Sequence, residues 1–142
     1  MPPSARAFLA AVAAPDPKAA ERLLDEGLSP DARVDGGRLV HHAAAGPSLA
    51  ILRLLLLRGA TVDALDGDLQ TPLCWAVRAG RAEQAKLLLR RGADPTVPLL
   101  DWTGPRIARS LLEHAQGQPK LRGLAALLKA VPARRRRRPV RA

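Results

Sequence analysis

The chain has 142 residues, which suits one domain, and its 47% hydrophobic content excludes wholesale disorder. The apolar residues are mostly Ala and Leu, Tyr is absent and there is one Phe, so thin layers of helices are favoured over a sandwich or a barrel. The net charge is +10 at pH 7, but the last ten residues hold six arginines and no acid, and the rest of the chain carries only +4.

The N-terminal residues predict a pair of short helices. Residues 7–14 form an apolar run that faintly resembles a secretory signal peptide, but the repeat pattern described below accounts for the same residues better. Asp16 and Pro17 are typical of the start of a second helix, and Gly27 follows its last apolar residues. Residues 49–57 are the most apolar window, yet this window is far too short to span a bilayer, so we expect no transmembrane segment.

The clearest local pattern lies in residues 71–95. Thr71 is a typical N-cap, and Pro72 at the first helical position loses no hydrogen bond. Apolar residues then recur at helical spacing, and a second apolar helix follows and ends before Gly92. This stretch therefore predicts two helices joined by a short turn.

The same pattern repeats along the chain. A shift of 33 residues brings residues 87–89 onto the apolar residues 54–56, and a further shift of 32 brings Val40 onto Phe8. The glycines that follow the second helices are spaced by 32 and 33 residues: Gly27, Gly59 and Gly92. A fixed period of this length indicates a repeat protein.

Residues 71–95 resemble an ankyrin repeat, whose pattern runs T-P-L-H-x-A-A-x-x-G through L-L-L-x-x-G-A-D, and residues 40–44 match the L-H-x-A-A portion. Cys74 stands where the family prefers His, and Leu69 stands where it usually has Gly. The resemblance implies an all-α solenoid of helix-turn-helix units with protruding β-hairpin loops. It also implies that His41 bonds to the backbone of an adjoining hairpin, and that His42 replaces an apolar residue and weakens the packing there.

We expect the repeat domain to cover residues 4–131, in repeats 4–30, 31–63, 64–96 and 97–131. In the fourth repeat, Asp101 to Gly104 match a hairpin tip, residues 105–115 predict a first helix, and leucines from Leu121 to Leu128 predict a final helix before Pro132. Residues 132–142 are predicted to be a disordered basic tail.

Few residues point to chemistry. Cys74 sits in the first turn of a helix near Arg78, but its place in the repeat favours a small buried residue over the nucleophile of a thiol enzyme. Adjacent His41 and His42 point about 100° apart on a helix, which disfavours a shared metal ion. Acids such as Asp31, Asp63, Asp66 and Asp101 fall at turns, where turn stabilisation explains them, and Trp75 is expected to lie between repeats. We therefore expect no enzyme, no catalytic residue, no metal and no cofactor.

The function implied by the resemblance is binding of a partner protein, as an adaptor or an inhibitor, by a monomer. In this family the partner lies on the hairpin tips and the inner helices. Carried over to this chain, that surface comprises Val34, Asp35, Gly37, Ala45, Gly67, Asp68, Gln70, Arg78, Trp102 and Thr103.

The alternative function is binding of nucleic acid or another acidic surface through the tail residues Arg134, Arg135, Arg136, Arg137, Arg138 and Arg141. A solvated extension is an equally good explanation, because Arg outnumbers Lys by 19 to 4 along the whole chain. The lone cysteine excludes an intrachain disulfide and indicates a reducing compartment, so a cytoplasmic location is expected, or a nuclear one in a eukaryote.

Overall fold

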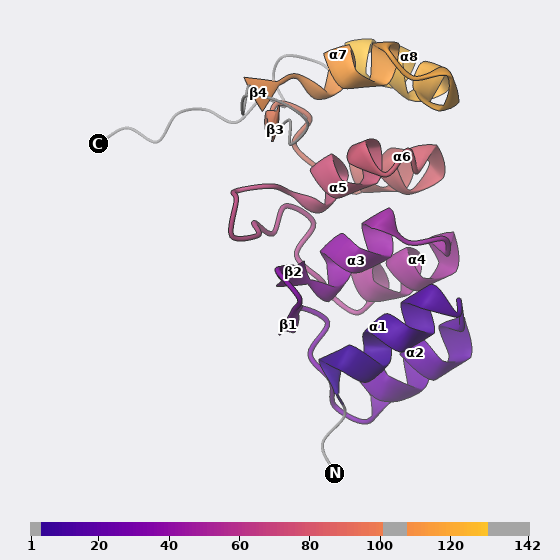
Figure 1. Ribbon diagram of the computed structural model, residues 1–142. Coiled ribbons are helices and arrows are strands. Elements are labelled where there is room, and N and C mark those ends of the chain that lie inside the picture. The colour runs from indigo at the N-terminus through magenta and orange to yellow at the C-terminus, as the bar shows by residue number, and fades with distance from the viewer. Residues whose placement is uncertain (1–3, 101–107, 131–142) are drawn as a thin grey trace.

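The computed structural model describes residues 4–100 and 108–130. Within these ranges the chain folds into helix pairs that stack in layers, from α1 and α2 at one end to α7 and α8 at the other (Figure 1). The helices are α1 (Ala5–Ala13), α2 (Pro17–Asp25), α3 (Leu39–Ala45), α4 (Leu49–Leu57), α5 (Pro72–Arg78), α6 (Ala82–Arg90), α7 (Leu111–Gln116) and α8 (Arg122–Ala130), with a 3-10 turn, η1 (Pro119–Leu121), before α8.

Side chains cap most of these helices, and two of these caps are the ones predicted from the sequence. Asp16 accepts the backbone N–H of Ala19 at the start of α2, and Thr71 accepts that of Cys74 at the start of α5. Ser4 caps α1, which therefore begins at Ala5, two residues before the predicted start. Helix ends are decided within one turn of the chain, and this explains why the sequence predicted them closely.

The helices pack in two rows. Helices α1, α3, α5 and α7 contact one another in succession, and α2, α4, α6 and α8 do the same in the second row. The core between the rows consists mainly of Leu, Ala and Val, and Leu73, Ala76 and Val77 of α5 are fully buried together, as their spacing predicts. Short side chains let neighbouring layers approach closely, and Phe8 of α1 adds a fully buried aromatic ring to this continuous core.

Two carboxylates link the turns that follow successive helix pairs, at equivalent places along the chain. Asp31 accepts the backbone N–H of Thr61 at 2.9 Å and the Thr61 hydroxyl at 3.1 Å, and Asp63 accepts the backbone N–H of Asp94 at 3.0 Å. These acids therefore stabilise turns, as the sequence predicts, and they also join the turns of neighbouring helix pairs.

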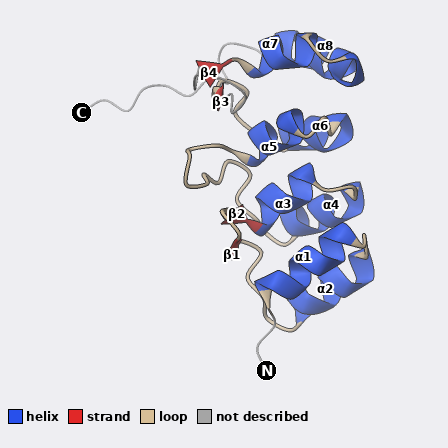
Figure 2. Cartoon of the chain, in the orientation of Figure 1, coloured by secondary structure: helices blue, strands red, loops and turns tan. Residues whose placement is uncertain are grey.

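Loops on one side of the stack carry the strands (Figure 2). Strands β1 (Arg33–Val34) and β2 (Gly37–Arg38) pair antiparallel, with Arg33 opposite Arg38 and Val34 opposite Gly37. The turn between them is Asp35-Gly36, with φ values of +45° and +84°, which suits the two-residue hairpin turn that has positive φ at both positions. Strands β3 (Leu99–Leu100) and β4 (Ala108–Arg109) also pair antiparallel.

Two sequence predictions about the loops are wrong. A β-hairpin was expected in each long loop, but the α4–α5 loop, residues 58–71, contains no strand. The Asp66 side chain and a backbone hydrogen bond from the Asp66 N–H to the Gln70 carbonyl organise this loop as turns. The helix predicted over 105–115 begins only at Leu111: residues 108–109 pair with β3, and Ser110 caps α7 by accepting the backbone N–H of Glu113.

The final helix forms close to its predicted place, with Leu121, Leu124 and Leu128 buried and Leu127 half-buried. Among the described residues, no helix combines the length and the apolar composition that crossing a bilayer requires. The basic tail lies outside the described residues.

Candidate functional site

A hollow of about 480 Å³ separates the β1–β2 hairpin from the α4–α5 loop. Its walls are Arg33, Val34, Asp35, Gly36, Gly37, Arg38, Leu65, Asp66 and Gly67. Four residues of the predicted partner surface, Val34, Asp35, Gly37 and Gly67, are thus brought together here although two loops supply them. This volume is in the range of pockets that take a small molecule or a few side chains.

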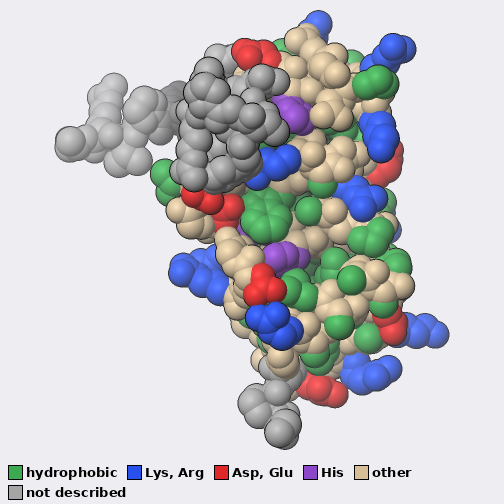
Figure 3. Space-filling model, viewed as in Figure 1, with side chains coloured by type: hydrophobic (Ala, Val, Ile, Leu, Met, Phe, Trp, Pro, Cys, Tyr) green, Lys and Arg blue, Asp and Glu red, His purple; other side chains and the backbone are tan. Residues whose placement is uncertain are grey.

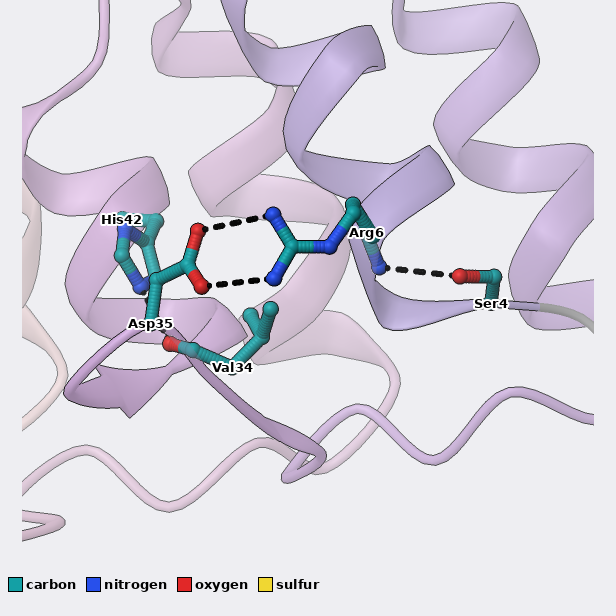
Figure 4. Close-up of polar contacts among 5 residues, drawn as sticks. All are labelled: Ser4, Arg6, Val34, Asp35 and His42. Atoms are coloured by element: carbon teal, nitrogen blue, oxygen red, sulfur yellow. Dashed lines mark hydrogen bonds and ion pairs between the residues drawn. The ribbon is translucent and has the colours of Figure 1, made fainter.

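The hairpin wall is attached to two helices (Figure 4). Asp35 receives two hydrogen bonds from the Arg6 guanidinium of α1, at 2.9 and 3.4 Å, and the Val34 carbonyl bonds to Nε2 of His42 of α3 at 2.7 Å. The half-buried His42 therefore has a polar partner. Although a polar side chain was expected to weaken the packing at this usually apolar position, the imidazole forms a hydrogen bond there.

The loop wall is organised by Asp66. Its Oδ1 accepts the backbone N–H groups of Asp68 at 2.8 Å and Gln70 at 2.9 Å, and its Oδ2 accepts the indole N–H of Trp75 at 2.8 Å. A carboxylate with three donors is held in one position, so the loop is held with it.

The Trp75 indole lies between repeats, as predicted. Its ring centroid is 5.2 Å from that of His41 and 5.0 Å from that of His42. It also crosses the base of the hairpin, where a Cβ added to Gly37 would lie 3.1 Å from its six-membered ring. Glycine at position 37 therefore lets the hairpin lie against the indole, and Trp75 forms part of the support beneath the hollow.

His41 joins the two walls. Its Nδ1 accepts the backbone N–H of Arg38 at 3.0 Å, and its Nε2 lies 2.9 Å from the Gln70 carbonyl. The first bond requires an unprotonated Nδ1, so the hydrogen-bond network assigns the proton to Nε2, which donates to Gln70. Burial lowers the pKa of this imidazole below its ordinary value of 6.5, despite opposing hydrogen bonds and the nearby Asp66. The backbone bond to an adjoining loop confirms the role that the repeat pattern implied.

The other predicted surface residues are placed differently. Asp68 is exposed beside the hollow. The prediction that Gln70 lies on an open surface is wrong: only 2% of it is exposed, because its side chain donates to the Pro98 carbonyl at 3.0 Å and accepts from Arg78 at 3.4 Å. Ala45 and Arg78 are half-buried. Trp102, Thr103 and the tail arginines lie outside the described residues.

Five residues of the hollow are absent from the predicted partner surface: Arg33, Gly36, Arg38, Leu65 and Asp66. The hairpin register contains a signal for two of them, because pairing Val34 with Gly37 necessarily places Arg33 opposite Arg38. No comparable signal marks Leu65, which is 42% exposed and reaches the hollow from another repeat.

Cys74 is fully buried, in agreement with the sequence prediction. Burial is the main influence on its thiol and raises the pKa above the ordinary value, although Thr71 and Arg78 act in the opposite direction. A buried thiol of raised pKa is a poor nucleophile. In the described part of the chain, no group of three or more His, Cys, Asp or Glu residues is arranged to hold a metal ion.

Charged side chains of both signs lie beside the hairpin on the face shown in Figure 3, and Lys or Arg side chains project at its edge. Stacked helix pairs with loops projecting from one side define a helical-repeat protein whose candidate site lies between loops of adjacent repeats. A family model for ankyrin repeats, in three copies, matches residues 8–98. The chain belongs to the ankyrin-repeat family.

Curated relatives match part of the chain. Palmitoyltransferase ZDHHC13 of Homo sapiens is 46% identical over 67 residues, which are 46% of this chain and 10% of the relative. Palmitoyltransferase Hip14 of Drosophila melanogaster is 47% identical over 60 residues, 42% of this chain and 9% of the relative. Palmitoyltransferase ZDHHC17 of Homo sapiens is 40% identical over 67 residues, again 46% and 10%. The chain thus matches about a tenth of the length of each of these relatives.

Proposed function

We propose that this chain is a protein-interaction module, an ankyrin-repeat solenoid that acts as an adaptor or inhibitor without catalysis of its own. The observation that carries the proposal is the hollow between the hairpin and the α4–α5 loop, which gathers predicted partner residues from two repeats. Membership of the ankyrin-repeat family supports it, because these repeats generally mediate contacts between proteins.

The polar groups around the hollow favour recognition over chemistry. Asp35 is paired with Arg6, and Asp66 and His41 are each bonded to backbone groups that hold the loops. Groups engaged in this way give a wall of defined shape, which suits a binding surface whose loops are already in place.

The test is affinity capture from extracts of the native source with the full chain as bait. The bait variant Asp68→Arg changes an exposed residue beside the hollow, and Glu26→Arg makes the same change of charge at an exposed residue just after α2 as the matched control. We expect a partner that the wild-type and control baits retain and that Asp68→Arg loses. A partner retained equally by all three baits would move the site away from these loops.

The tail provides the second candidate function, binding of nucleic acid or another acidic surface. Six arginines in ten residues favour it, since cationic side chains neutralise phosphates. Deletion of residues 134–138 is expected to abolish a salt-sensitive interaction and to leave partner capture through the loops unchanged. An interaction that does not depend on salt would contradict this second function.

A further inference from the structure

Four charged side chains line the hollow, and the two acids are already engaged. Asp35 receives the bidentate pair from Arg6, with 2.9 Å between Arg6 Nη2 and Asp35 Oδ1. Asp66 receives two backbone N–H groups and the Trp75 indole N–H. The Arg6 guanidinium therefore neutralises Asp35, and the oxygens of Asp66 are occupied by donors of the protein, so neither acid is readily available to a ligand.

The two arginines are not compensated in the same way. Among the described residues, neither Arg33 nor Arg38 forms an ion pair with a carboxylate. Arg38 donates from Nη1 to the Asp31 carbonyl at 3.0 Å, and its Nε–H is buried with no acceptor in the described part of the chain. Arg33 is exposed and lies directly opposite Arg38 in the hairpin register.

Together with Arg6, three guanidinium groups lie at the hollow against two carboxylates, so the hollow combines an excess of positive charge with an apolar wall. Leu65 faces the hairpin from the α4–α5 loop and remains 42% exposed, and half-buried Val34 lies on the hairpin side. A concave surface with charge of one sign attracts the opposite charge more strongly than a flat, solvated surface does. A guanidinium also binds a carboxylate through two parallel hydrogen bonds, which gives direction as well as attraction.

We infer that the hollow receives an acidic segment of the partner protein, with an Asp or Glu carboxylate on Arg33 and Arg38 and a neighbouring apolar side chain against Leu65. This inference rests on the proposed protein-binding function and specifies the chemistry of the partner. A volume of about 480 Å³ accommodates a few side chains of one extended segment. A basic segment does not fit, since Asp35 and Asp66 are already occupied and the two arginines repel it.

The test uses a displayed library of random ten-residue peptides, selected on the full-length chain in 0.3 M salt. Peptides from the wild-type selection are then measured against two full-length variants. Arg33→Glu reverses an exposed charge at the hollow, and Arg53→Glu makes the same change on an exposed residue of α4. The net charge and the basic tail are the same in both variants, so nonspecific attraction falls equally and the comparison isolates the hollow.

We expect selected peptides that share Asp or Glu next to an apolar residue, with affinity at least tenfold weaker for Arg33→Glu and changed less than twofold for Arg53→Glu. Arg33→Gln is expected to give an intermediate loss. Acidic peptides that bind both charge-reversed variants equally overturn the inference.

Two further outcomes separate the inference from the function. Peptides without acids that lose binding to Asp68→Arg keep the protein-binding function and overturn the acidic partner. A library that yields no ligand contradicts both.

Discussion

Removing the Asp66 carboxylate tests whether this one side chain holds the α4–α5 loop. The variant Asp66→Ala leaves three donors without their acceptor: the backbone N–H groups of Asp68 and Gln70, at 2.8 and 2.9 Å, and the Trp75 indole N–H at 2.8 Å. The indole packs against His41, so the loss reaches the contact between repeats.

The expected cost follows from those three bonds. A hydrogen bond to a charged acceptor contributes about 1.5 to 3 kcal/mol when buried, and partial exposure lets water replace part of that contribution. We therefore expect Asp66→Ala to lower the free energy of unfolding by about 2 to 4 kcal/mol. Asp66→Asn keeps an oxygen for the backbone donors and loses the acceptor for the indole, so its cost is expected to be about 1 to 2 kcal/mol.

The measurement is urea unfolding followed by circular dichroism of the helices. Asp68→Ala is the matched control in the same loop, since its side chain is exposed, and we expect it to change stability by no more than about 0.5 kcal/mol. Equal stabilities for Asp66→Ala and Asp68→Ala would refute the reasoning, because the loop would then hold its shape without the carboxylate.

Three further predictions concern single buried or strained residues. The pKa of His41 is lowered in the folded protein, so the unfolded chain takes up a proton near pH 6.5 and the folded chain only at lower pH. Stability is therefore expected to fall as the pH drops below 6.5. Urea midpoints at pH 7.5 and 5.5 measure this loss, which His41→Gln should reduce. The raised pKa and full burial of Cys74 predict slow alkylation by iodoacetamide in the folded protein and rapid alkylation in urea, and fast modification under native conditions would contradict that protection. Leu69 has a φ of +61° and is 67% exposed, so Leu69→Gly is expected to equal the wild-type stability or exceed it by up to about 1 kcal/mol. Leu69→Val should lose about 1 kcal/mol of stability. A Val variant more stable than the wild type would show that the backbone at this position is not strained.

The helices could be predicted from the sequence because their signals are local. Asp16 and Thr71 cap their helices within three residues, and Leu73, Ala76 and Val77 line one face of a single helix. Apolar residues at helical spacing also predicted a helix over 105–115, but residues Ala108–Arg109 of this stretch form strand β4. Strand pairing depends on a second segment, and periodicity within one segment does not show whether a partner strand exists.

The candidate site was predicted only in part. The repeat register groups Val34, Asp35, Gly37 and Gly67, and these four residues line one hollow because each repeat presents its loop on the same side of the stack. It misplaced Gln70, whose position at the end of the loop looks solvent-facing until the Pro98 carbonyl of the next repeat covers it. Burial of a polar side chain depends on acceptors from a neighbouring layer, which the order of residues within one repeat does not specify.

Periodicity, helix starts and the spacing of 32 to 33 residues are contained in the sequence, because each depends on residues within a turn or on identity at a fixed interval. The charge of the hollow, by contrast, depends on contacts between residues that are far apart in the sequence. Arg6 belongs to α1 and neutralises Asp35 of the hairpin, and Trp75 of α5 donates a hydrogen bond to Asp66, while Arg33 and Arg38 form no ion pair among the described residues. Counting charges along the loops gives two acids and two bases and predicts a neutral site. The pair between Arg6 of the first repeat and Asp35 of the second brings a third guanidinium to the hollow, and that contact exists only once the layers are stacked.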